Sequence, residues 1–307
     1  MYNRVLFIGS KKAGFKVLKK MYYTAPDKLS GCVTVDDSLD SRSELEAIKS
    51  FCNKKGIQID ILTGKCDLTE SIDKYEPDIC FVMGWYYIID EKLIEQVRGG
   101  FVGIHNSLLP LHRGFAPVVW AMISGDTETG VTVFSFDKGM DTGAIWYQQK
   151  VAIDTDDYIN DVLAKIDEKI SCFFDDFYIG ILSERIHPTK QKLDNISYGA
   201  KRTPEDGIID WSKNADDIYN FIRAQSKPYP GAFTYYKGER VVIWKSKIFP
   251  FMIQGNPGQI GLIDSVNKSV IVVCGNDTGI ILESIEKEGK EISVMDEVKS
   301  LKYKMGE

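Results

Sequence analysis

The 307-residue chain lacks the features that mark several classes of protein. Its net charge is −6, so the excess of Lys and Arg that marks most nucleic-acid-binding domains is absent. No stretch approaches the roughly 20 apolar residues of a membrane-spanning helix. The first ten residues, MYNRVLFIGS, lack the apolar run of about 7–15 residues found in signal peptides. We therefore expect a cytoplasmic protein that does not enter a membrane.

Cysteine and histidine are scarce as well. The six cysteines form no C-x-x-C pair, and the chain has only three histidines. A structural zinc site needs several of these ligands in a cluster, so we expect no metal. The irregular spacing of the cysteines indicates reduced thiols that are mostly buried.

The composition is otherwise that of a folded protein, with 44% hydrophobic and 27% charged residues. In the first half, short apolar runs alternate with stretches of helical periodicity, such as Leu45, Ile48 and Cys52. Repeated βα units predict an α/β, Rossmann-like domain with a mostly parallel sheet that is covered on both faces. The expected strands are Val5–Ile8, Cys32–Val35, Ile57–Ile61, Ile79–Met83, Phe101–Ile104, Val131–Phe136 and Ile145–Val151.

The second half changes in character. Apolar residues at helical spacing predict a long helix over 159–177, and a polar stretch follows over 185–204. We place a domain boundary at its end, which divides the chain into residues 1–203 and 204–307. A helix at 215–224 and closely spaced short strands predict a small barrel or sheet of about 100 residues for the second part. These strands are Ala232–Tyr236, Val241–Trp244, Gln259–Asp264, Ser269–Val273 and Gly279–Ser284.

Two polar residues stand where a parallel sheet opens onto a ligand crevice. His105 directly follows the strand at 101–104, a good place for an imidazole that transfers protons. From position alone, His105 could equally be a histidine held by backbone hydrogen bonds. Asp141 lies in the loop DKGMDTG, whose two glycines let the backbone approach a ligand closely. Such a loop is more often a simple hairpin turn.

The turn over Gly9–Gly14 follows the first strand and could hold a phosphate on its backbone N–H groups. It matches neither G-x-G-x-x-G nor the P-loop pattern. An ordinary βα turn therefore explains it as well.

Several motifs together resemble a known family. The stretch HNSLLPLHRGFAP at 105–117 is similar to the H-x-SLLP-x-x-RG-x-AP signature of the methionyl-tRNA formyltransferase superfamily. The loop at 137–143 matches the family's D-x-G-x-D-[TS]-G pattern, and the 36 residues between His105 and Asp141 match its spacing. Arg202–Trp211 and Pro228–Phe233 resemble signatures of its second domain, so the likeness spans nearly the whole chain.

The resemblance implies a Rossmann-like catalytic domain, an OB-like C-terminal barrel and 10-formyltetrahydrofolate as the donor of a formyl group. It implies that His105 is the catalytic histidine and that Asp141 tunes it. Residues assigned to the substrate are Ser10, Lys11 and Arg113. Residues assigned to the folate are Tyr87, Ile88, Ile89, Ser107, Leu108, Leu109, Pro110, Asp137, Lys138, Gly139 and Met140.

One position departs from the family pattern. The family reads N-x-H-x-S, and its asparagine helps to hold the developing oxyanion, but Gly103 stands there in this chain. Loss of one such donor costs on the order of a hundredfold in rate. Either Asn106 or a backbone N–H replaces it, or catalysis depends more heavily on His105. A non-catalytic homologue that binds folate or a sugar nucleotide is the alternative.

The acceptor distinguishes two branches of the family. The tRNA formyltransferases carry a basic loop after the second strand, whereas here Val35–Glu44 is acidic and would repel a phosphate backbone. We therefore expect a nucleotide-linked amino sugar as the partner and no nucleic acid, with methionyl-tRNA as the alternative. The sequence leaves open which sugar and base are used and the oligomeric state, a homodimer included.

Overall fold

The computed structural model describes residues 1–40 and 42–307. Ser41, which belongs to the acidic stretch at 35–44, lies outside the described residues. The chain divides into two compact units, each built from several segments. The first contains Met1–Arg113, Gly130–Lys150 and Lys165–Tyr198; the second contains Gly114–Thr129, Val151–Ala164 and Gly199–Glu307. The single boundary expected after residue 203 stays a prediction.

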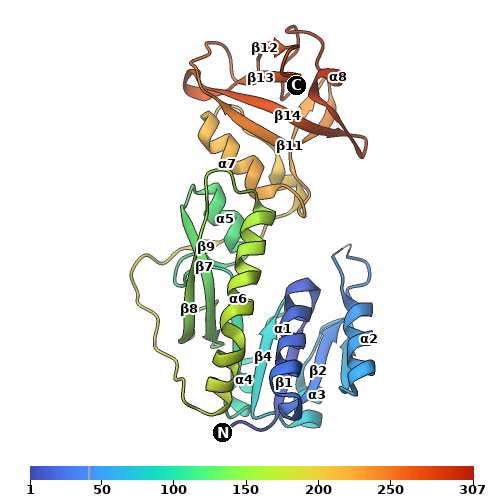
Figure 1. Cartoon of the computed structure of the whole chain (residues 1–307), viewed down its shortest axis with the longest axis vertical. Coiled ribbons are helices and arrows are strands. Elements are labelled where there is room, and N and C mark those ends of the chain that lie inside the picture. The colour runs from blue at the N-terminus through green and yellow to red at the C-terminus, as the bar shows by residue number, and fades with distance from the viewer. Residues whose placement is uncertain (41) are drawn as a thin grey trace. The chain divides into compact units, whose positions relative to one another are not determined.

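A seven-stranded sheet, counted over the described residues, forms the centre of the first unit (Figure 1). Its order is β3-β2-β1-β4-β5-β7-β8. The first five strands in this order are parallel, and β7 is antiparallel to β5. The bounds are β1 Val5–Gly9, β2 Leu29–Val35, β3 Ile59–Leu62, β4 Ile79–Met83, β5 Phe101–His105, β7 Glu128–Ser135 and β8 Ile145–Ala152.

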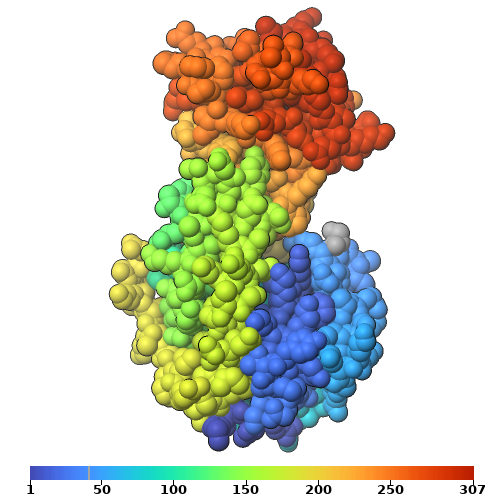
Figure 2. Space-filling view, viewed as in Figure 1, coloured from blue at the N-terminus to red at the C-terminus, as the bar shows by residue number. Residues whose placement is uncertain are grey.

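Helices cover both faces of this sheet, which is why β1 and β4 are apolar throughout and buried throughout. Successive side chains of β4 point to opposite faces. Cys80 and Val82 pack with α3 and α4, whereas Phe81 contacts Phe174 and Tyr178 of α6. In Figure 2 the side chains of α6 lie along those of α1. The bounds are α1 Lys11–Thr24, α2 Leu45–Lys55, α3 Thr69–Tyr75, α4 Glu91–Gln96 and α6 Ile159–Leu182.

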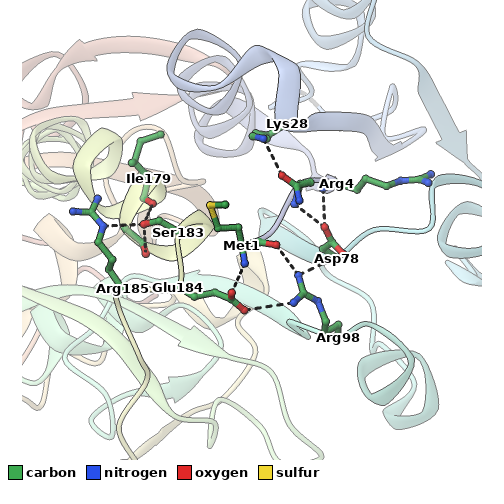
Figure 3. Close-up of polar contacts among 11 residues, drawn as sticks. Met1, Arg4, Lys28, Asp78, Arg98, Ile179, Ser183, Glu184 and Arg185 are labelled. Atoms are coloured by element: carbon green, nitrogen blue, oxygen red, sulfur yellow. Dashed lines mark hydrogen bonds and ion pairs between the residues drawn. The ribbon is translucent and has the colours of Figure 1, made fainter.

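Ion pairs hold the beginning of the chain against the first unit (Figure 3). The amino group of Met1 pairs with Glu184, and Arg98 reaches Glu184 at 3.5 Å and Asp78 at 3.6 Å. The carboxylate of Asp78 also accepts the backbone N–H groups of Asn3 and Arg4. Asp78 directly precedes β4, and Arg98 lies between α4 and β5, so these contacts gather at the end of the sheet where the parallel strands begin.

The second unit is built on an antiparallel six-stranded sheet, again counted over the described part of the chain. Its order is β10-β11-β14-β13-β12, with β15 paired to β14. Ile218 and Ile222 of α7 enter its core beside Trp211. The bounds are β10 Ala232–Tyr236, β11 Glu239–Phe249, β12 Ile260–Asp264, β13 Ser269–Val273, β14 Gly279–Lys287, β15 Lys290–Ser293, α5 Pro117–Ile123, α7 Ala215–Gln225 and α8 Val294–Glu297.

The predicted fold class is confirmed: a mostly parallel α/β domain precedes an antiparallel β domain. β11 is longer than predicted, because its pairing with β14 continues to Phe249. The short helices α3 and α5 were not predicted, because seven residues show too little periodicity. The two-residue strands β6 Arg113–Gly114 and β9 Tyr198–Gly199 pair with each other. Among the residues described, no helix is long and apolar enough to cross a membrane.

Candidate active site

His105 is the last residue of β5 and lies at the carboxyl edge of the parallel strands, as predicted. Its side chain is 10% exposed, and both ring nitrogens have neighbours. Nε2 lies 2.8 Å from the backbone oxygen of His112, and Nδ1 lies 3.6 Å from Oδ2 of Asp141. A carbonyl oxygen only accepts hydrogen bonds, so Nε2 carries a proton. Nδ1 is therefore the ring nitrogen that faces the Asp141 carboxylate.

The His112 carbonyl is held in place by the backbone conformation of His112 and by hydrogen bonds around it. His112 has a φ of +53°, which is uncommon for a residue other than glycine. Its N–H donates to Oγ of Ser197 at 2.8 Å. The preceding turn is closed by the Ser107 hydroxyl, which donates to the Leu111 carbonyl at 2.6 Å. The position of the His105 ring therefore depends on residues far from it in sequence.

Side chains of β7 and β8 support the Ser107–Pro110 segment. The Thr132 hydroxyl donates to the Ser107 carbonyl at 2.7 Å and accepts the Leu109 N–H at 3.2 Å. The Gln148 amide donates to the Leu109 carbonyl at 2.9 Å. This segment, which the resemblance assigns to the folate, is thus fixed on one side by the sheet.

The loop over Asp137–Gly143 brings Asp141 to the histidine. Asp137 accepts the Gly139 N–H at 3.0 Å and the Thr142 hydroxyl at 2.5 Å, which closes the loop on itself. Asp141 has a φ of +53°. A Cβ at Gly143 would lie 1.7 Å from the Ser135 carbonyl oxygen, so only glycine fits there. The loop, which connects the neighbouring strands β7 and β8, is therefore fixed by its own hydrogen bonds and by close packing at Gly143.

The space beside Gly103 is filled by aromatic rings. Gly103 pairs with Phe134 across β5 and β7, and a Cβ at Gly103 would lie 2.2 Å from the Phe136 ring. The rings of Phe134 and Phe136 stack at 5.3 Å. An asparagine at position 103 would therefore overlap the Phe136 ring, and an aromatic side chain fills the space beside this position.

This packing gives a stability prediction. We expect Gly103→Asn to lower the free energy of unfolding by about 1–3 kcal/mol, because the new side chain overpacks against Phe136. Denaturant unfolding would measure the loss. In a Phe136→Ala background the same Gly103→Asn change should cost less, since the space is then open and the two effects are not additive. Strictly additive losses would show that Phe136 does not fill this position.

The other residues assigned from the sequence are more dispersed. Tyr87 is 42% exposed and Ile88 fully exposed, whereas Ile89 is buried in the core formed with α3 and α4. A hydrogen bond with the Cys66 thiol raises the pKa of Tyr87. Lys138, Gly139 and Met140 are exposed. The side-chain Oδ1 of Asn106 is buried and has no hydrogen-bond partner within the described chain.

The residues assigned to the substrate make contacts within the protein. Ser10 is buried, and its hydroxyl donates to the Gly84 carbonyl at 2.6 Å. A Cβ at Gly9 would lie 2.1 Å from the Met83 carbonyl oxygen, so close packing explains this glycine without a phosphate. Arg113 is 3% exposed and donates to Gln191 and to Tyr198. The roles proposed for Ser10 and Arg113 at the substrate stay predictions.

The acidic stretch lies over the turn that follows β1. The Nζ atom of Lys11 is 2.6 Å from Asp37 and 2.8 Å from Asp40. Burial lowers the pKa of Lys11, but its hydrogen bonds with these two carboxylates outweigh this and raise it. Arg42, together with Lys11, holds the pKa of Asp40 well below its usual range. Part of the negative charge at 35–44 is therefore neutralised locally.

Gln191 and Ser197, which contact the Asp141 loop and His112, were missed by the sequence analysis. Both lie in the polar stretch 185–204, at the end of which the domain boundary was placed. No local pattern marks them, because their partners are 50 and 85 residues away. Nowhere in residues 1–40 and 42–307 do three or more His, Cys, Asp or Glu side chains gather to hold a metal ion.

Comparison with known proteins matches most of the chain to one family. Residues 26–173 match the family model described as formyl transferase, and residues 201–300 match the model of the formyl transferase C-terminal domain. A methionyl-tRNA formyltransferase from Caldanaerobacter subterraneus subsp. tengcongensis is 30% identical over 295 residues, which cover 93% of each chain.

Two solved structures share the fold over nearly their whole length. The sugar 3N-formyl transferase WlaRD, in the presence of dTDP and 5-N-formyl-THF, has a TM-score of 0.67 at 21% identity, covering 94% of this chain and 98% of its own. The N-formyltransferase from Helicobacter canadensis, with folinic acid and dTDP-3-aminofucose, has a TM-score of 0.69 at 19% identity, covering 91% and 98%. With the family models and the 30% identical relative, the chain belongs to the formyl transferase family.

Proposed function

We propose that this protein transfers a formyl group from 10-formyltetrahydrofolate to the amine of a nucleotide-linked amino-deoxysugar, in the cytoplasm. The product would be a formamido sugar for a surface glycan. The observation that carries the proposal is the pair His105–Asp141, 3.6 Å apart at the carboxyl edge of the sheet, in a chain of the formyl transferase family. His105 and Asp141 are the proposed catalytic residues.

The residues at this edge fit a folate. β4 and β5 are neighbours in the sheet, so the loop after β4 lies beside the loop that begins at His105. Tyr87 and Ile88 in the first loop and Met140 in the Asp141 loop are exposed apolar side chains, which a flat ring system would cover. The buried indole Nε1 of Trp85 has no hydrogen-bond partner within the described chain and could donate to such a ligand.

When bound, 10-formyltetrahydrofolate supplies an activated one-carbon unit at the formyl oxidation level. The attacking amine must be neutral, and negative charge develops on the formyl oxygen as attack proceeds. With Nε2–H held by the His112 carbonyl, a proton at Nδ1 beside Asp141 makes the His105 ring positive. His105 would then stabilise the developing charge. As the bond between the formyl carbon and the folate nitrogen breaks, the Nδ1 proton would pass to that leaving nitrogen, and Nδ1 would take up the proton released by the attacking amine.

Asn106, which follows His105 in the chain, is a further polar residue with a role to assign. Its side-chain Oδ1 is buried and lacks a hydrogen-bond partner within the described residues. A buried acceptor without a partner is costly, and an incoming amine N–H would satisfy it. Since Phe136 fills the space beside Gly103, Asn106 cannot stand in the place of the family asparagine. We assign it to holding the acceptor amine.

The choice of a sugar acceptor is supported by charge. Lys11 and Arg42 neutralise only part of the negative charge of Asp36, Asp37, Asp40 and Glu44, so this surface stays acidic. Such a surface suits a small nucleotide sugar better than a long phosphate backbone. The two structural neighbours bound with dTDP or a dTDP-linked amino sugar support the same choice.

Methionyl-tRNA is the second candidate acceptor, and one observation favours it: the relative that is 30% identical over 93% of the chain is a methionyl-tRNA formyltransferase. The chemistry at the amine is the same for both acceptors. The difference lies in how the rest of the acceptor is held.

Steady-state assays with both acceptors distinguish the two functions. We expect turnover with at least one dTDP-linked 3-amino- or 4-amino-deoxysugar, and a kcat/KM that falls only weakly as salt is raised. A tRNA acceptor would instead give a steep loss, since each phosphate contact adds about one unit to the slope of log affinity against log salt. Efficient formylation of charged initiator tRNA, with no turnover of any amino sugar nucleotide, would refute the proposed acceptor.

A further inference from the structure

We propose that Gln191 is a positioning residue for Asp141, and that Arg113 acts through it. This inference rests on the proposed function of the His105–Asp141 pair. Gln191 lies in the segment 189–198, between α6 and β9, and its side chain is 9% exposed in a stretch whose neighbours are exposed. A buried amide in a polar surface segment needs a reason, and its contacts supply one.

The amide of Gln191 bridges two sides of the site. Its Nε2 donates to the backbone carbonyls of Asp141 and Gly143, both at 2.8 Å, and its Oε1 accepts from Arg113 at 2.6 Å. The two N–H groups of the amide thus bind the carbonyls on either side of Thr142. This fixes the backbone that carries the Asp141 carboxylate.

The chemistry of the three partners sets the orientation of this amide. A guanidinium only donates hydrogen bonds, so the oxygen of Gln191 must face Arg113. Carbonyl oxygens only accept, so the NH₂ group must face Asp141 and Gly143. The reversed amide would place donors against donors and an oxygen against two oxygens. Arg113 is buried and also donates to the Tyr198 hydroxyl at 3.1 Å. It therefore fixes the orientation of the Gln191 amide.

Asp141 needs this support because of its backbone. Its φ of +53° is uncommon for a residue other than glycine, although aspartate adopts it more readily than most, so hydrogen bonds to this backbone help to keep it in place. The segment 189–198, which carries Gln191, is anchored to β8 by two backbone hydrogen bonds between Thr189 and Ile145, at 2.7 and 2.8 Å. At its other end Ser197 holds His112, whose carbonyl accepts from His105. Through Gln191 the segment 189–198 binds the backbone of Asp141, and through Ser197 it binds His112, the residue that accepts from His105.

The sharpest test is Gln191→Glu. The carboxylate keeps the size of the side chain and its partner Arg113, but it replaces the two N–H donors with an oxygen that faces two carbonyl oxygens. We expect kcat to fall by about 10²-fold, as for a displacement of about 1 Å at a reacting group, with KM for the acceptor nearly unchanged. Gln191→Ala should give a loss of similar size. Lys192→Ala, on an exposed neighbour, is the matched control and should keep the wild-type kcat.

A second readout makes the test independent of turnover. We expect the imidazole ¹⁵N resonances of His105 to move in Gln191→Glu but not in Lys192→Ala, at equal thermal unfolding midpoints. If the wild type transfers formyl to no acceptor, the proposed function fails, yet these resonances still decide whether Gln191 positions the pair. Resonances in Gln191→Glu that match the wild type, or an unchanged kcat, would overturn the proposal.

Discussion

We expect His105→Ala to lower kcat for formyl transfer by about 10³-fold, the effect of losing a positioned group that stabilises charge and moves a proton. This loss of kcat should be large for a single catalytic residue, because Gly103 supplies no side-chain donor to share its role and Phe136 fills the neighbouring space. KM for the folate should change little, since the segments assigned to it keep their own hydrogen bonds to β7 and β8. Steady-state kinetics at saturating folate measure both constants.

His187→Ala is the control for this variant. His187 is exposed and lies in the same unit, so its loss removes an imidazole without touching the site. We expect its kcat to match the wild type. A His105→Ala enzyme that retains most of its activity while remaining folded would show that the histidine is structural, as its position alone allowed.

Asp141→Asn should lower kcat by about 10²-fold or more. The amide keeps the size of the carboxylate, and asparagine tolerates the positive φ of +53° at this position better than most residues, so the loop should hold its shape. What is lost is the negative charge 3.6 Å from Nδ1 of His105. Without it the positive form of the ring loses its partner, and the proton at Nδ1 is held less well.

The matched control is Asp194→Asn, which removes an exposed carboxylate from the segment 189–198. Thermal unfolding should show both variants folded, and only Asp141→Asn should be slow. If Asp141→Asn were as fast as the wild type across the pH range, the carboxylate would have no part in tuning the histidine. A loss confined to KM would place Asp141 in binding rather than in catalysis.

Much of the fold followed from local patterns in the sequence. The apolar runs that end at Gly9, Met83 and His105 are strands buried on both faces, so they read as continuous hydrophobic stretches. The long helix was marked by apolar and aromatic residues at helical spacing, two of which, Phe174 and Tyr178, pack on β4. These are signals that depend on residues close together in the chain.

The support of the site did not follow from the sequence, because it is made of long-range hydrogen bonds. Arg113 and Gln191 are 78 residues apart, and Gln191 lies in a stretch whose polarity was used only to place a domain boundary. The signature arginine was assigned to the substrate on resemblance, whereas the structure buries it against Gln191 and Tyr198. Polar residues that satisfy one another inside a protein have no periodicity that a single sequence reveals.

The surroundings of Gly103 were likewise not predictable from the sequence, because they come from a distant part of the chain. The sequence revealed that the family asparagine is missing but not what takes its space. The ring of Phe136 is 33 positions away in the chain and reaches Gly103 through the pairing of β5 with β7. That an aromatic ring lies against Gly103 is therefore visible only once the two strands are side by side.

The central claim is tested most directly by following the formyl group itself. The enzyme would be incubated with 10-formyltetrahydrofolate carrying a ¹³C-labelled formyl group and with dTDP-linked 3-amino- and 4-amino-deoxysugars, and the products analysed by mass spectrometry and NMR. We predict that the label appears in the amide of a formamido sugar, with the wild type and not with His105→Ala. Label that remains on the folate with every amino sugar, or that passes only to charged initiator tRNA, would contradict the claim.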